Sequence, residues 1–129
     1  MPFDWKAFLD LARELHTRSR EAANPEAFLH TALSRAYYAA FCYARNYAQD
    51  YLKFDPRGDP DDHGRLRHNL RSKRRGGTAT RLDRLRQWRN ESDYHDEMRI
   101  DLLIAVEAAI AEAAYVFTSL PAPGRTGGE

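Results

Sequence analysis

Apolar side chains recur at helical spacing along most of the chain, beginning close to its first residue. Between residues 4 and 20 they lie three or four positions apart and form one helix face: Trp5, Phe8, Leu9, Ala12 and Leu15. No segment alternates between apolar and polar residues for long enough to predict a β-strand. The pattern therefore predicts an all-α protein.

A second and longer helix is predicted from a strong start signal. Asn24-Pro25-Glu26 combines an N-capping residue, a proline at the first helical position and an acid near the positive end of the helix dipole. This helix is expected to run to about Lys53. Residues 55–60, which are rich in proline and aspartate, then stop it.

Three further helices are predicted, the first of them short. The short helix covers residues 61–74 and ends before Gly76-Gly77, and Thr78 is expected to cap the next helix. The last helix is expected to begin between residues 92 and 96. Its apolar positions are close to heptad spacing: Leu103, Val106, Ile110, Ala113, Phe117 and Leu120.

Chain length and composition indicate one domain outside the membrane. With 129 residues, four main helices and short connections, residues 1–120 are predicted to form a single up-down helical bundle, followed by a flexible tail over residues 121–129. The lone Cys42 excludes an intramolecular disulfide and favours a reducing compartment. Acidic residues interrupt the apolar run over residues 100–115, and the first residues lack the apolar core of a signal peptide. We therefore expect a cytoplasmic protein with no membrane partner.

The second helix is apolar on two faces. Its outer side begins and ends with polar residues, but Tyr38, Phe41 and Cys42 interrupt that side in the middle. A helix of this kind either lies in the middle of a fold or meets a partner. Because a small bundle has little interior, we expect a homodimer with these three residues in its interface. The alternative is that another part of the same chain covers them.

Positive charge is concentrated between residues 65 and 89. This segment contains ten of the 20 Lys and Arg residues and one acid, a net charge of +9, whereas the whole chain carries +1. Such a segment would attract a polyanion. We expect five of its cations to contact phosphate groups, which the family resemblance given below implies to be those of RNA: Arg71, Lys73, Arg74, Arg75 and Arg86. The alternative is a solvated connector between two helices.

Arg89 is the leading candidate for a site residue. It follows Leu82 by seven positions and so lies on the same inward helix face. An inward arginine needs a carboxylate, a carbonyl cluster or a ligand phosphate. Asp93, one turn later, is the structural candidate for that partner, whereas the functional interpretation uses the guanidinium fork as a phosphate clamp.

His95 is the second candidate, because a histidine can transfer protons near neutral pH. Six residues separate it from Arg89, so on an unbroken helix the two side chains would diverge. A shared site therefore requires the helix to end near Glu91-Ser92. Ser92 and Asp93 are suitable N-caps for the next helix, which makes that break reasonable.

No metal or cofactor site is predicted. His63 and His68 are five positions apart, which is the wrong spacing for one helix face, and no cysteine or acid cluster accompanies them. The chain also lacks a glycine-rich phosphate loop followed by Lys-Ser/Thr.

Three segments together resemble HEPN domains (higher eukaryote and prokaryote nucleotide-binding). Residues 34–41, Ser-Arg-Ala-Tyr-Tyr-Ala-Ala-Phe, resemble the small and aromatic centre of that family's long second helix. His63-Gly64 resembles the start of its middle segment. Residues 85–94 resemble its Leu…Arg-x-x-Ala-Asp-Tyr ending, with Ser92 in place of the alanine. The segments occur in the family's order.

The resemblance implies a helical bundle that pairs through the faces carrying these motifs. Many HEPN domains are metal-independent ribonucleases with an Arg, a polar residue and, a few positions later, a His, and Arg89-Asn90-x4-His95 fits this signature. It implies catalytic roles for Arg89, His95 and Asn90, and supporting roles for Asp93 and Tyr94. It also implies a toxin with a nucleotidyltransferase-type antitoxin as partner. Other members are non-catalytic nucleotide- or partner-binding modules, and that alternative stays open.

Overall fold

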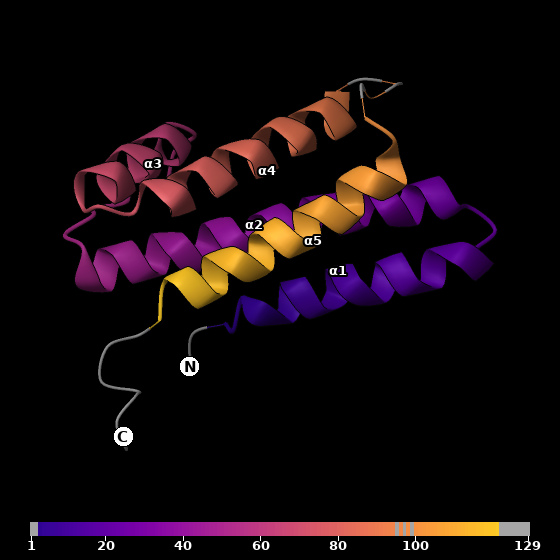
Figure 1. Cartoon of the computed structure of the whole chain (residues 1–129), viewed down its shortest axis with the longest axis horizontal. Helices are drawn as coiled ribbons and strands as arrows, with labels where there is room; N and C mark the ends of the chain where they lie inside the picture. The colour runs from indigo at the N-terminus through magenta and orange to yellow at the C-terminus, as the bar shows by residue number, and fades with distance from the viewer. Residues whose placement is uncertain (1–2, 95, 97, 99, 122–129) are drawn as a thin grey trace, which may run out of the picture.

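The computed structural model describes residues 3–94, 96, 98 and 100–121, and its fold is the predicted all-α bundle. The described residues form five α-helices and a single 3-10 turn, with no strand among them. The helices are α1 (Lys6–Arg18), α2 (Pro25–Tyr51), α3 (Asp62–Ser72), α4 (Gly76–Tyr94) and α5 (Leu102–Ser119), and the 3-10 turn η1 (Ser19–Glu21) follows α1. Successive main helices run up and down, with the short α3 beside the start of α4 (Figure 1).

The centre of the bundle is α2. This helix contacts α1, α3, α4 and α5, and twelve of its 27 residues are buried. It begins as predicted at Asn24, whose side-chain oxygen accepts a hydrogen bond from the Ala27 N–H at 3.4 Å. Its position explains why its sequence is apolar on more than one side: the helix lies in the middle of the fold.

α5 closes the bundle against α2 and α4. By length and composition it is apolar enough to cross a membrane, and 28% of its 18-residue window is buried in the fold. Its two acids contact neighbouring helices: Glu107 is hydrogen-bonded to the His16 ring at 3.1 Å, and Glu112 makes ion pairs with Arg81 and Arg84 at 3.1 and 3.0 Å.

The boundary between α4 and α5 differs from the prediction. α4 continues to Tyr94 instead of ending near residue 91, and α5 begins at Leu102. Ser92 does not cap a helix, because it is buried and its hydroxyl hydrogen-bonds the His30 ring of α2. The cap of α5 is Asp101, whose carboxylate accepts hydrogen bonds from the backbone N–H groups of Leu103 and Ile104.

Thr78 is likewise not the cap of α4, which begins at Gly76. The Thr78 side chain is buried, and its hydroxyl hydrogen-bonds the Ser119 hydroxyl of α5 at 2.7 Å. It therefore ties the start of α4 to the end of α5.

Candidate functional site

Arg89 lies on the last turns of α4 and is held against α2. Its Nη1 donates to the Tyr38 hydroxyl at 2.9 Å, and its Nη2 donates to the Asn90 amide oxygen at 2.8 Å. The guanidinium carbon also lies 5.2 and 5.3 Å from the ring centres of Tyr37 and Tyr38, within the range of cation–π attraction. The arginine is thus fixed mainly by neutral groups.

The charge of Arg89 is only partly compensated. The predicted ion pair with Asp93 is present, but the distance from Nη1 to the carboxylate is 3.8 Å and the Asp93 side chain is 36% exposed. Only 17% of the Arg89 side chain is exposed, and its buried Nε has no hydrogen-bond partner among the residues that the structure describes. A guanidinium in this state retains the capacity to bind an anion.

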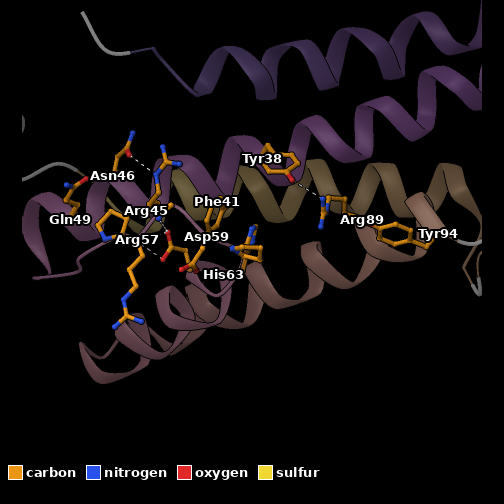
Figure 2. Close-up of a pocket in the computed structure, with 14 residues that line it drawn as sticks. Tyr38, Phe41, Arg45, Asn46, Gln49, Arg57, Asp59, His63, Arg89 and Tyr94 are labelled. Atoms are coloured by element: carbon orange, nitrogen blue, oxygen red, sulfur yellow. Dashed lines mark hydrogen bonds between the residues drawn. The ribbon is translucent and has the colours of Figure 1, made fainter.

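A cleft of about 910 Å³ opens beside this arginine (Figure 2). It lies between α2, the end of α4, and the loop and first turn that lead into α3. Its lining is Tyr38, Phe41, Arg45, Asn46, Gln49, residues 56–60, Asp62, His63, Arg89 and Tyr94.

His63, in the first turn of α3, forms part of the cleft wall. Its ring stacks on Phe41, with ring centres 4.0 Å apart and planes 11° apart, and its Nδ1 hydrogen-bonds the Tyr37 hydroxyl. Burial, and after it the positive charges of Arg89, Arg86 and Arg67, lower the pKa of His63 to about 4. His63 is therefore neutral at pH 7 and a weak base.

Tyr37 is protonated for a related reason. Burial raises the pKa of its hydroxyl above the ordinary value of 10.0, and the charge of Arg89 opposes that shift only in part. Tyr37 and His63 therefore form a neutral, hydrogen-bonded pair, and the Tyr37 ring lies against the Arg89 guanidinium.

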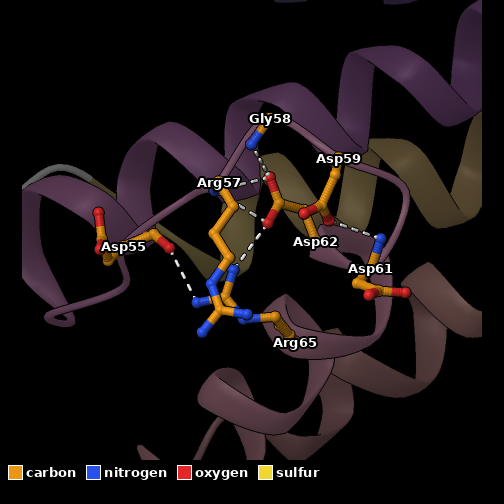
Figure 3. A network of polar contacts seen from close by, with 7 residues as sticks. All are labelled: Asp55, Arg57, Gly58, Asp59, Asp61, Asp62 and Arg65. Atoms are coloured by element: carbon orange, nitrogen blue, oxygen red, sulfur yellow. Dashed lines mark hydrogen bonds and ion pairs between the residues drawn. The ribbon is translucent and has the colours of Figure 1, made fainter.

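Asp62 holds the loop wall of the cleft in place (Figure 3). Its carboxylate accepts hydrogen bonds from the backbone N–H groups of Arg57 and Gly58 at 2.8–3.1 Å, and from Nη1 of Arg65 at 2.7 Å. Burial raises the pKa of this carboxyl, but these hydrogen bonds outweigh burial and keep the pKa below its ordinary value. The residue next to His63 is thus the anchor of the loop.

The structure brings together some of the predicted site residues. Asn90 bonds to Arg89, Asp93 is its ion-pair partner, and Tyr94 reaches the cleft with 75% of its surface exposed. His95, the predicted second catalytic residue, lies outside the described residues.

The predicted interface residues need a correction. Phe41 and Cys42 are 7% and 5% exposed, so both are already covered within one chain. His63 covers the Phe41 ring, and Arg45 lies over the same ring at 5.9 Å. The alternative stated above, that the chain itself covers this face, therefore holds for Phe41 and Cys42, whereas Tyr38 remains partly exposed.

The basic segment does not form one continuous patch. Arg71, Lys73 and Arg74 are exposed at the turn between α3 and α4. Fourteen helical positions separate this turn from Arg89, a distance of about 21 Å along α4. Arg75 lies over the Tyr47 ring at 5.8 Å. Of the five cations predicted to contact RNA, Arg86 is the one that contributes to the positive field at His63.

Other cations of the segment are paired with acids: Arg65 with Asp62, Arg67 with Asp83, and Arg81 and Arg84 with Glu112.

Prediction from the sequence missed His63 as part of the cleft. The only signal for it was the His63-Gly64 pair. Its neighbours Tyr37 and Phe41 lie more than 20 positions away along the chain.

Among the described residues, no group of three or more His, Cys, Asp or Glu side chains is placed to hold a metal ion. No family model, curated protein or solved structure matches this chain.

Proposed function

We propose that this protein is a metal-independent endoribonuclease of the HEPN type, which binds RNA in the cleft around Arg89 and acts as a cytoplasmic homodimer. The observation that carries the proposal is the state of Arg89. It is largely buried and held by the Tyr38 hydroxyl and the Asn90 amide, and the nearest carboxylate paired with it among the described residues, that of Asp93, is 3.8 Å away. A site of this kind suits the phosphate of a nucleic acid.

In the proposed reaction, the RNA 2′-oxygen attacks the adjacent phosphorus and the bond from phosphorus to the 5′-oxygen breaks. One base must take the proton of the 2′-hydroxyl, and one acid must protonate the leaving 5′-oxygen. Arg89 would stabilise the charge that develops on the phosphorane. We assign both proton transfers to His95 and its copy in a second protomer, because His63 is too weak a base near neutral pH.

The proposal is tested by incubating purified protein with RNA in excess EDTA. We expect cleavage that leaves 2′,3′-cyclic phosphate ends. Arg89→Ala and His95→Ala should each abolish it, and Asn90→Ala should reduce it less. Arg84→Ala, an exposed arginine of the same helix, and His68→Ala are the matched controls and should cleave like wild type.

Mixing the two inactive variants tests the shared site. Heterodimers should recover at most part of the wild-type rate, and light scattering should report about twice the mass of one chain. The proposed ribonuclease activity would be refuted by wild-type protein that cuts no RNA, or by His95→Ala protein that cuts as fast as wild type. Binding of RNA without cleavage would instead establish a non-catalytic binding module. Co-purification with a small nucleotidyltransferase-type protein would identify the proposed antitoxin.

A further inference from the structure

Two more arginines lie half-buried on the same side of α2 as Tyr38. The Arg35 guanidinium lies 4.9 Å from the ring centre of Phe8 and 5.9 Å from that of Tyr38. The Arg45 guanidinium lies 5.9 Å from the ring centres of both Trp5 and Phe41. Within the described part of the chain, no carboxylate pairs with either arginine.

These arginines connect to Arg89 through shared rings. Arg35 and Arg89 both lie within 6 Å of the Tyr38 ring centre. Arg45 lies over Phe41, whose ring stacks on His63 beside Arg89. Figure 2 shows Arg45, Phe41, His63, Tyr38 and Arg89 following one another along α2. We call Arg35, Arg89 and Arg45 the cationic strip.

The strip differs from the other arginine clusters of the fold. On the outer side of α4, Glu112 neutralises Arg81 and Arg84 at 3.1 and 3.0 Å. In the strip, three cations lie over aromatic rings. Among the described residues, one carboxylate pairs with them, that of Asp93 at 3.8 Å from Arg89, and the buried Nε atoms of Arg35 and Arg89 have no hydrogen-bond partner. Like charges gathered at a partly dry surface repel one another, and an anion bound among them removes that cost.

The length of the strip indicates a polyanion. Arg35 and Arg45 are ten positions apart on one helix, about 15 Å along its axis, with the Arg89–Tyr38 contact between them. A guanidinium group that lies over a ring can still present N–H groups to phosphate oxygens; in Arg45 the Nε already donates to the Asn46 amide oxygen at 3.1 Å, which leaves its Nη groups for such contacts. Exposed rings such as Tyr94 offer surfaces for bases. A second copy is the poorer occupant of the outer parts of the strip, because it would place Arg35 and Arg45 against other cations. The shared site of the proposed function needs the second protomer only next to Arg89.

We propose that the cationic strip binds the backbone of single-stranded RNA, with Arg35 and Arg45 each holding a phosphate that flanks the one at Arg89. This inference rests on the proposed function, because it assigns the path of the RNA through the site. It predicts that the strand runs along α2, and not toward the basic turn at residues 71–75.

The test measures binding of a 2′-O-methyl RNA oligonucleotide, which the proposed reaction cannot cleave, by fluorescence anisotropy over a range of salt. The logarithm of the association constant falls linearly with the logarithm of the salt concentration. Loss of one phosphate contact should make this negative slope shallower by about 0.7. We expect that reduction for Arg35→Gln and for Arg45→Gln, and about twice it for the double variant. Arg13→Gln and Arg84→Gln, exposed arginines outside the strip, should leave the slope unchanged.

Further measurements show whether a change in slope comes from the lost phosphate contact or from a change in the fold. Arg35→Lys and Arg45→Lys should retain most of the slope, and circular dichroism should show the wild-type fold. Binding of the oligonucleotide should also raise the pKa of His63, observed by NMR, because the bound phosphates offset the field of the arginines.

The outcomes separate the two proposals. If the double variant keeps the wild-type slope while wild type cleaves RNA, the RNA-binding role of the cationic strip is refuted and the proposed ribonuclease activity is supported. If the slopes become shallower as expected but wild type cuts no RNA, RNA binding by the cationic strip is supported and the proposed ribonuclease activity is refuted. If the double variant turns a dimer into a monomer with its slope unchanged, the strip is an interface between copies and the proposal is overturned.

Discussion

Replacing Asp62 with asparagine removes the charge that anchors the loop wall of the cleft. The carboxylate of Asp62 is 3% exposed and accepts hydrogen bonds from the Arg57 and Gly58 backbone and from the Arg65 guanidinium. An amide has one acceptor oxygen, and its NH₂ group would face N–H donors. At least one buried donor and the charge of Arg65 then lose their partner, which costs about 2–4 kcal/mol of unfolding free energy.

That loss corresponds to a fall of about 10 °C in Tm, since unfolding entropy is about 2.1 cal/mol/K per residue. Thermal unfolding followed by circular dichroism at pH 7 measures it. Asp61→Asn is the matched control, because the neighbouring Asp61 side chain is exposed and accepts no hydrogen bond from a described residue; its Tm should stay within about 2 °C of wild type.

The pH dependence gives an independent check. The folded-state pKa of Asp62 lies below the unfolded value, so the stabilisation is present above the unfolded pKa and is lost as pH falls through the folded one. The difference in Tm between wild type and Asp62→Asn should therefore be full at pH 7 and shrink below about pH 4. A variant as stable as wild type at pH 7, or a difference that persists unchanged at pH 2, would contradict this account.

Three other outcomes are expected. Arg74 has a positive φ of +63°, which glycine adopts without strain, so Arg74→Gly should raise the free energy of unfolding in urea by about 1 kcal/mol. Lys73→Gly, at φ −101°, should not raise it. Arg89→Gln should raise the pKa of His63 from about 4 in an NMR titration, because a positive charge is removed; an unchanged pKa would refute the assigned field. Burial raises the pKa of Cys42, so its alkylation should be slow in native protein and fast in urea; equal rates would contradict its burial.

The helices were predictable because their signals are local. Apolar spacing and the Asn24-Pro25-Glu26 start set α1 and α2 to within a few residues. The connection between α4 and α5 was not predictable in the same way, because several residues between 90 and 101 are suitable caps. The choice is made by a contact across the fold, since the Ser92 hydroxyl bonds to His30 on α2 and leaves Asp101 to begin the last helix.

In the candidate site too, residues placed by local spacing were predictable and residues placed by contacts across the fold were not. Arg89 and its partner Asp93 share one helix, so the seven-residue spacing from Leu82 was enough to place Arg89, and the four-residue spacing from Arg89 was enough to place Asp93. His63 joins them only because α3 folds back over α2, and this contact sets its ring on Phe41 and its Nδ1 on the Tyr37 hydroxyl. Nothing in the spacing of the histidines could indicate that packing.

The two apolar sides of α2 had two explanations, a central position or a partner, and the structure gives the helix a central position. That result changes which residues can carry function. Because Phe41 and Cys42 serve the interior, the accessible chemistry of α2 passes to Arg35, Tyr38 and Arg45, which lie over or beside those buried groups. The site and the core therefore share side chains: the ring that positions His63 is also a core residue. Substitution of Phe41 should alter stability and the cleft together, whereas replacement of Arg35 or Arg45 removes a charge and leaves the buried ring of Phe41 in place, so its effect on binding can be measured once circular dichroism shows the wild-type fold.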